Sequence, residues 1–378
     1  GTDNTAVGAS SMLNIKDGYS NVAIGVNAGQ TLVDGYYNTY LGVNAGNGAV
    51  TNAHSNVGIG LSALSSNHGA GNVAIGRGAL SNTTDANQVA IGYSALEANT
   101  SGEKNTAIGF QALEANTTGS YNVAIGHEAL ELNVGGYYNV AIGYEALATL
   151  APNSTEGYNT ALGYSAGTAL TTGTFNTLLG AQAGDSLTTA QRNTMVGHNA
   201  GQALTTQSYN TFIGERAGEN TSDGVYNTFI GYLSGYNASH ASGRNVFIGS
   251  NTGQSANNQY QSVFIGVEAG YGSSSDGSSN IAIGYRSFYS STSGIFNTVI
   301  GQEAGYGLTS GRNNTLIGYR SGYALTTTNH NIFIGEEAGR YATSAEQNTG
   351  IGYHALGEGT LTGDENVAIG QQSMADAT

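Results

Sequence analysis

Residues 122–130 read Asn-Val-Ala-Ile-Gly-His-Glu-Ala-Leu, and variants of this segment recur along the whole chain. The motif Asn-x-x-Ile-Gly, with conservative replacements, occurs 22 times. Of the 21 intervals between copies, 14 are 17 residues long and the others are 16, 18 or 20. A short period that varies only outside a constant core is typical of a solenoid, in which each repeat forms one rung. The first motif position, numbered 0 below, falls at residues 4, 21, 38, 56, 72, 88, 105, 122, 139, 159, 176, 193, 210, 227, 245, 262, 280, 297, 314, 331, 348 and 366.

The columns of the repeat predict a short strand followed by a corner. Position +1 is Thr, Val or Ile and position +3 is aliphatic in every copy, a pattern typical of a strand with one buried face. Position +4 is Gly in all 22 copies, which predicts a positive φ or backbones too close for a Cβ. Asn at position 0 tolerates a left-handed conformation and can form an amide ladder on stacked rungs. We therefore expect an all-β parallel β-solenoid of 22 rungs, a single repeat domain over residues 1–378.

Composition excludes several classes of protein. The 378 residues include 59 Gly but only 1 Pro, which excludes collagen, and no Cys, which excludes disulfides and thiolate metal sites. The net charge is −15 and the 10 Lys and Arg residues are scattered, so we expect no nucleic-acid partner. No apolar run approaches the length of a membrane span, so we expect no membrane insertion by this segment. No signal peptide precedes the first repeat, so we expect a segment of a longer fibrous protein whose uncapped ends join end-to-end neighbours.

Two columns exchange volume with each other. Position +2 is apolar or Gly in every copy, although it points away from positions +1 and +3. In 20 of 22 copies, one of positions +2 and +8 is large and the other is small. Such compensation indicates that both side chains fill one shared space. We expect positions +1 and +3 to form the core of one chain and the second compartment to be an inter-chain seam, which includes Ala74, Leu80, Phe212, Gly218, Phe229, Phe247, Phe264 and Phe333. The alternative is that both compartments lie inside one wide chain.

The segments Asn72–Ala79 and Asn122–Ala129 resemble the Ser-Val-Ala-Ile-Gly head repeats of YadA-type trimeric autotransporter adhesins. They are also similar to repeats in phage tail-fibre proteins. The resemblance covers essentially the whole chain. It implies a left-handed parallel β-roll in which three chains surround one axis, and therefore a homotrimer.

Catalytic and metal-binding patterns are weak in this sequence. None of the seven His residues is spaced for metal ligation with a second His or a carboxylate cluster, so we expect no metal and no cofactor. Consecutive repeats carry Glu residues in variable positions, which we interpret as a solvated acidic stripe rather than a glycosidase pair. We therefore expect no enzyme. The His residues are His54, His68, His127, His198, His240, His330 and His354, and the Glu residues are Glu97, Glu114, Glu128, Glu131 and Glu145.

Tyrosine recurs in two columns of the repeat. Where position +5 is not Tyr it is mostly polar, so we expect this column to face solvent. Exposed Tyr residues one rung apart can stack on sugar rings or on a protein partner, or they can shield the backbone. The candidate binding residues are Tyr93, Tyr144, Tyr164, Tyr232, Tyr285, Tyr319 and Tyr353 at position +5. A second set precedes position 0 and comprises Tyr37, Tyr121, Tyr138, Tyr158, Tyr209 and Tyr226.

These features favour a structural fibre or adhesin segment, a stiff trimeric rod for surface attachment or receptor binding. We expect it to be extracellular, on a virion tail fibre or a cell surface, and to bind a cell-surface glycan or a protein receptor on a host. One alternative is an ice-binding solenoid, which needs a flat face with Thr in register on one strand. Another is a fibre that binds or depolymerises polysaccharide.

Overall fold

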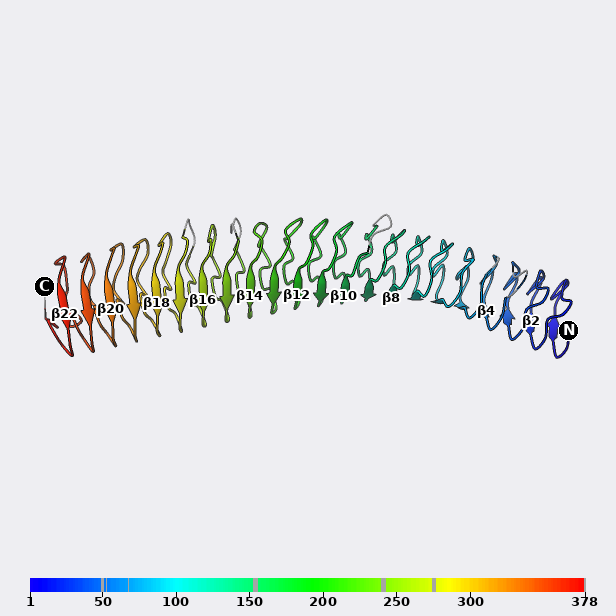
Figure 1. Ribbon diagram of the computed structural model, residues 1–378, viewed down its shortest axis with the longest axis horizontal. Coiled ribbons are helices and arrows are strands. Elements are labelled where there is room, and N and C mark those ends of the chain that lie inside the picture. Colours follow the sequence, from blue (N-terminus) through cyan, green and yellow to red (C-terminus); the bar gives the residue numbers. More distant parts are fainter. Residues whose placement is uncertain are drawn as a thin grey trace. The chain divides into compact units, whose positions relative to one another are not determined.

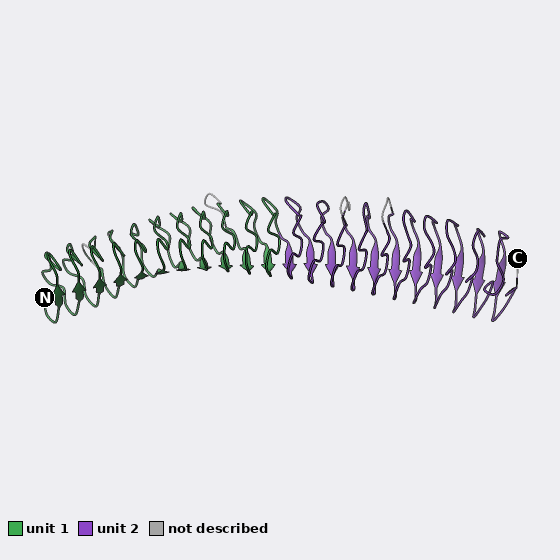
Figure 2. Cartoon of the chain, turned by 180° about the vertical axis from the view of Figure 1, so that it is seen from behind, with its two compact units in different colours: residues 1–191 green, residues 192–378 purple. Residues whose placement is uncertain are grey.

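The computed structural model describes residues 1–48, 51, 53–66, 68–151, 156–238, 243–273 and 277–376. It divides into two compact units, Gly1–Gln191 (unit 1) and Arg192–Thr378 (unit 2), shown in Figure 2. The described residues form 22 strands of three residues each and no helix. The prediction of an all-β parallel solenoid with rungs of about 17 residues is confirmed.

Each strand covers positions +1 to +3 of one repeat, and its neighbours in the same unit pair with it in parallel and in register. Because Ala124 lies opposite both Ala107 and Ala141, each column of the repeat forms a continuous row. Figure 1 shows the strands on one side of each unit and the long turns on the other. The strands of unit 1 are β1 (Thr5–Val7), β2 (Val22–Ile24), β3 (Thr39–Leu41), β4 (Val57–Ile59), β5 (Val73–Ile75), β6 (Val89–Ile91), β7 (Thr106–Ile108), β8 (Val123–Ile125), β9 (Val140–Ile142), β10 (Thr160–Leu162) and β11 (Thr177–Leu179). Those of unit 2 are β12 (Thr194–Val196), β13 (Thr211–Ile213), β14 (Thr228–Ile230), β15 (Val246–Ile248), β16 (Val263–Ile265), β17 (Ile281–Ile283), β18 (Thr298–Ile300), β19 (Thr315–Ile317), β20 (Ile332–Ile334), β21 (Thr349–Ile351) and β22 (Val367–Ile369).

The glycine at position +4 is required by both backbone conformation and space. Gly126 has a φ of 141°, a value that residues with a side chain rarely adopt. A Cβ at Gly126 would lie 2.2 Å from the carbonyl oxygen of Gly143 on the next rung. Both reasons given for this column from the sequence are therefore confirmed.

The asparagines at position 0 form a buried amide ladder, as predicted. Asn38 donates its backbone N–H and its Nδ2 to Oδ1 of Asn21, each over 3.0 Å, and also donates Nδ2 to the carbonyl of Ala53 over 2.9 Å. These bonds satisfy the polar groups of a fully buried side chain, which would otherwise be costly to bury. The left-handed residue is the one before the ladder, such as Tyr37 with a φ of 57°, and the expectation that the Asn itself occupies this conformation is wrong.

The apolar core lies inside a single chain. Positions +2 and +8 fill it together with the Ala of position +7 and buried Leu at position +11, such as Ala28 and Leu32. A Cβ added at Gly218 would lie 2.6 Å from Cε2 of Phe212, so the volume exchange occurs within one rung. The predicted inter-chain seam is therefore wrong, because side chains fully buried in one chain leave no surface for another. All eight seam residues are buried in this core, namely Ala74, Leu80, Phe212, Gly218, Phe229, Phe247, Phe264 and Phe333.

Positions +1 and +3 form the outer face of the sheet instead. Val123 and Ile125 of β8 are half-buried, while Ala124 between them is fully buried. The expectation that +1 and +3 form the core is wrong, and so is the alternative that both compartments lie inside the chain. A three-residue strand alternates its side chains between two faces, and here the middle side chain points inward.

Candidate binding surface

The position +5 aromatics of unit 1 form a stacked ladder. Tyr93, Phe110, His127, Tyr144 and Tyr164 follow one another with ring centroids 4.9–5.3 Å apart and interplanar angles of at most 15°. The exposed fractions of Tyr93, Tyr144 and Tyr164 are 41%, 42% and 56%. Because the rings cover one another's faces, the middle of the ladder presents ring edges and hydroxyls to solvent rather than stacking surfaces.

The position +5 tyrosines of unit 2 are arranged differently. Tyr285, Tyr319 and Tyr353 occur on every second rung, and Gln302 and Glu336 occupy the rungs between them. Among the described residues, no ring stacks on Tyr285 or Tyr319 along this column. Tyr285 and Tyr353 are 42% and 43% exposed, and Tyr319 is half-buried. Tyr232, which is 47% exposed, lies three rungs before Tyr285 in the same column.

Arginines accompany two of these tyrosines. The guanidinium carbon of Arg286 lies 5.1 Å from the ring centroid of Tyr285, and that of Arg320 lies 4.9 Å from the centroid of Tyr319. A cation at this distance from an aromatic ring is attracted by the ring electrons. Each arginine is also held by a carboxylate on the preceding rung, since Arg286 Nε donates to Glu268 over 2.6 Å and Arg320 Nε donates to Glu303 over 2.7 Å.

The tyrosines that precede position 0 also stack, and cations lie against their ends. Tyr121, Tyr138 and Tyr158 follow at centroid distances of 5.1 and 5.0 Å. Lys104 Nζ donates to the Tyr121 hydroxyl over 3.0 Å, and this bond raises the pKa of Lys104. In unit 2, Tyr209 and Tyr226 stack at 4.9 Å. Tyr37 instead contacts the rings of Tyr19 and Tyr36 edge to face.

A third aromatic ladder was missed by the sequence analysis. Tyr271, Tyr289, Tyr306 and Tyr323 at position +9 stack at 5.0–5.1 Å with interplanar angles of at most 9°. The same column comparison that identified position +5 would have found this ladder. Arg286 lies between Tyr285 and Tyr289 of one rung, 5.5 Å from the centroid of Tyr289, so the two columns form one surface.

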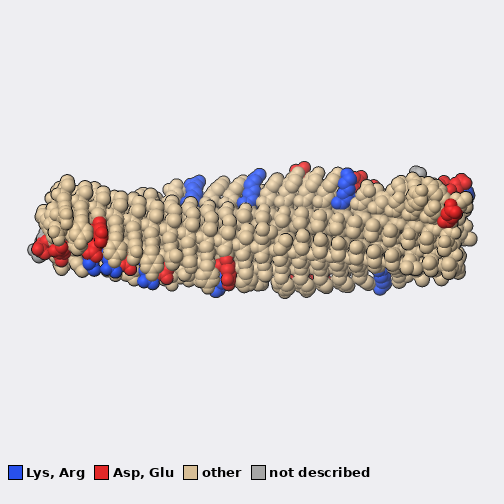
Figure 3. All heavy atoms as spheres, turned by 90° about the horizontal axis from the view of Figure 1, so that it is seen from below, with Lys and Arg blue, Asp and Glu red and all other residues tan. Residues whose placement is uncertain are grey.

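Carboxylates are paired differently in the two units. In unit 2, Glu219, Glu268, Glu303 and Glu337 each bind an arginine at 2.8 Å or less. In unit 1 the half-buried Glu97, Glu114, Glu128, Glu131 and Glu145 have no arginine or lysine ion pair among the described residues. Burial raises the pKa of Glu131, and the neighbouring Glu128, Glu114 and Glu145 raise it further. Figure 3 shows how sparse the charged side chains are on one face of the molecule.

His68 is the one buried histidine of the described chain, and it lies in the core of unit 1. Tyr40 Oη and His68 Nε2 are 2.8 Å apart, and His68 Nδ1 lies 2.7 Å from the carbonyl oxygen of Ser66. Burial lowers the pKa of His68 to about 4. The pair is a satisfied polar contact inside the core. Among the described residues there is no cluster of three or more His, Asp or Glu that could hold a metal ion, and His240 lies outside them.

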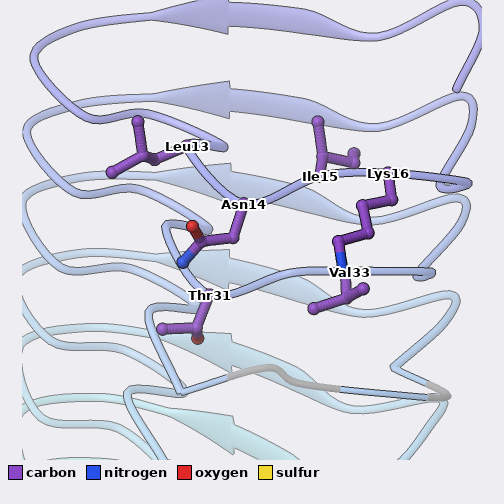
Figure 4. A pocket seen from close by; sticks show the side chains of 6 residues that line it. All are labelled: Leu13, Asn14, Ile15, Lys16, Thr31 and Val33. Atoms are coloured by element: carbon purple, nitrogen blue, oxygen red, sulfur yellow. The ribbon is translucent and has the colours of Figure 1, made fainter.

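A shallow hollow crosses two rungs near the start of unit 1. Figure 4 shows its side chains on two successive turns, and none of them is a carboxylate or a histidine. The one titratable side chain in its lining is Lys16. The lining residues are Leu13, Asn14, Ile15, Lys16, Thr31 and Val33.

Comparison with models of protein families and with curated proteins finds no match. No helix of the described residues is long and apolar enough to cross a membrane.

Proposed function

We propose that the chain is a structural segment of an extracellular fibre or adhesin, in which three copies associate and display aromatic columns for attachment to a receptor. The observation that carries the proposal is the outer sheet face. Its half-exposed Val, Thr and Ile side chains form two rows along every strand of each unit, with no charged residue among the strand positions. Position +3 is aliphatic on every strand, and a partly exposed aliphatic row of this kind marks an interaction site. Copies of the chain share the same rung spacing, so their side chains can interdigitate rung by rung.

The internal construction of each unit supports a mechanical role. Successive rungs contribute main-chain hydrogen bonds, an apolar core and a polar side chain at position 0 to the same rows. That side chain is an amide except at Ser262. Phe212, Phe229, Phe247 and Phe264 stack in the core at 4.7–4.9 Å with interplanar angles of at most 6°. Rows that continue from rung to rung give a stiff element whose outer positions are free to vary, which suits attachment.

Oligomer mass tests this proposal. Ile125→Lys places a charge on the outer sheet face of β8, and in a trimer the charge would occur three times around the axis. We expect wild type to sediment as a trimer and Ile125→Lys to sediment as a monomer. The matched control is Leu132→Lys on the same rung, where the side chain is 44% exposed and away from the sheet face. A monomeric wild type, or equal loss of assembly in both variants, would contradict the proposal.

Ice binding is a second candidate function, because the outward column contains Thr in register. Thr194, Thr211 and Thr228 lie side by side on β12, β13 and β14, and each is half-exposed. Ice binding needs Thr in register on one strand face, and position +1 supplies it, although this column was expected to lie in the core. Thermal hysteresis of wild type and of Thr211→Tyr tests it. Activity in the wild type that Thr211→Tyr removes would favour ice binding, and no hysteresis would exclude it.

A further inference from the structure

From β16 to β21, two outer columns of unit 2 repeat with a period of two rungs rather than one. Over these rungs position +6 alternates between acid and base, and position +5 alternates between Tyr and another residue. Two rungs consequently carry the same constellation of two tyrosines with an arginine between them, which we call platforms. The first platform comprises Tyr285, Arg286 and Tyr289, and the second comprises Tyr319, Arg320 and Tyr323.

The two platforms have nearly the same geometry. The guanidinium carbon of Arg286 lies 5.1 and 5.5 Å from its two ring centroids, and that of Arg320 lies 4.9 and 5.4 Å from its own. The carboxylates that orient the two arginines, Glu268 and Glu303, bind at 2.6 and 2.7 Å. Each platform therefore offers one tyrosine ring that no other ring covers, the edge and hydroxyl of a tyrosine in the stacked ladder, and a fixed donor group.

The distance between the platforms is set by the rungs. Tyr306 lies between Tyr289 and Tyr323 in the stacked ladder, at centroid distances of 5.0 and 5.1 Å. Equivalent atoms of the two platforms are therefore about 10 Å apart, as expected for two strand spacings in a sheet. Gln302, which is exposed, occupies position +5 on the rung between them.

We propose that these two platforms bind a linear, neutral, β-1,4-linked polysaccharide, with one disaccharide on each platform. In such a chain each sugar is turned by about half a turn from the previous one, so the same face recurs at every second sugar, a distance close to two rungs. Tyr285 and Tyr319, on which no described ring stacks, contact the apolar C–H faces of sugars. The hydroxyls of the ladder tyrosines, the arginine and Gln302 can bond to sugar hydroxyls. This inference rests on the proposed role in attachment and names the ligand class for it.

Charge and hydrogen-bonding capacity favour a neutral glycan over two other ligands. Each platform arginine is already neutralised by a glutamate, so the strip offers no net positive charge to an anionic glycan. A proline-rich peptide has a turn of about 9.3 Å, close to the same spacing. Its backbone, however, mainly offers acceptors, whereas sugar hydroxyls both donate and accept. The amide of Gln302 and the carboxylate of Glu303 between the platforms match hydroxyls better than they match such a backbone.

Calorimetric titration of the full chain with β-1,4-linked gluco-oligosaccharides tests the proposal. We expect the affinity to rise by about tenfold or more from two to six sugars, because the longer chain engages both platforms at once. An α-1,4-linked glucan of six sugars, which curls and lacks the spacing, should not bind. A flat dependence on length, equal binding of the α-linked chain, or binding only of a proline-rich peptide would overturn the proposal.

Variants locate the site. Tyr319→Ala should reduce the affinity for six sugars to that for two, and the Tyr285→Ala/Tyr319→Ala variant should lose binding. The matched control is Phe296→Ala in the same unit, an aromatic side chain that is 58% exposed and belongs to neither platform. Equal loss in the control would overturn the assignment. The dependence of affinity on oligosaccharide length is measured on the wild type, so it tests the proposal even if a substitution unfolds the unit. A wild type that sediments as a trimer but does not bind the glycan would contradict the glycan site alone. A monomeric wild type would contradict the fibre proposal.

Discussion

The same core space is filled in two ways in the two units. Around β5–β9, position +2 is Ala and position +8 is Leu, as in Ala124 with Leu130. Around β13–β16, position +2 is Phe and position +8 is Gly, as in Phe229 with Gly235. All these side chains are buried in the chain's own core. Each rung therefore keeps the combined volume of positions +2 and +8 while the residue types change, because the strand spacing holds the neighbouring backbone in place.

Truncating the core of unit 2 should have the largest effect. Phe229 stacks on Phe212 at 4.7 Å and on Phe247 at 4.8 Å, so Phe229→Ala removes a ring between two others. We expect a loss of about 3–5 kcal/mol in the free energy of unfolding. The comparison variant in unit 1 is Leu113→Ala, whose expected loss of about 2–5 kcal/mol overlaps this range but lacks the ring stack. Hydrogen exchange followed by mass spectrometry measures the effect rung by rung.

If Phe229→Ala left the exchange of β13–β15 unchanged, the ring stack would not stabilise unit 2.

The next largest effect should be a loss of stability at low pH that occurs in unit 1. His68 in unit 1 is buried and neutral, and its pKa is lowered from 6.5 to about 4. The unfolded state takes up a proton below pH 6.5 while the folded state does not, so this contribution is complete above pH 6.5 and falls as the pH approaches 4. The loss is about 3 kcal/mol. We expect the protection factors of the amides around Tyr40, taken relative to intrinsic exchange at each pH, to fall over this range, and the His68→Gln variant should remove that pH dependence. An unchanged fall in the protection factors of His68→Gln would contradict the assignment.

Alanine at the corner glycine should have a similar effect in both units. Gly126→Ala in unit 1 and Gly214→Ala in unit 2 each place a Cβ against a neighbouring carbonyl oxygen, at 2.2 and 2.5 Å, at positive φ. The backbone strain alone costs about 1–3 kcal/mol. Urea unfolding followed by circular dichroism measures it. An effect in only one unit would mean that the corner has different roles in the two.

The sequence predicted the period, the strand, the corner and the amide ladder, because each depends on one column of residue types. It did not predict which face of the strand is inside. Alternation places position +2 on the opposite face from positions +1 and +3. Both faces are largely apolar, so hydrophobicity alone does not show which of them is buried. Two signals did indicate the answer. Position +1 is Thr in 11 of 22 copies, which suits solvent, and volume exchange between +2 and +8 requires an enclosed space.

The candidate binding residues were predicted only as columns. Whether Tyr144 or Tyr285 has a neighbouring ring depends on the residue in the same column one rung away. The columns show that residue, but it was not used to predict which rings stack. The arginine contacts could not be predicted from the columns, because the side chains of Arg286 and Arg320 each reach a carboxylate on the preceding rung.

Positions +2 and +8 fill one space inside a single chain, and a paired substitution can show this. Gly218→Leu alone should overpack the rung against Phe212 and cost about 1–3 kcal/mol. Phe212→Ala with Gly218→Leu recreates the filling of unit 1 and should return the free energy of unfolding to within about 1.5 kcal/mol of wild type. Both variants should keep the sedimentation mass of the wild type. A single variant that changes mass without losing stability, or a double variant that is not rescued, would contradict the claim.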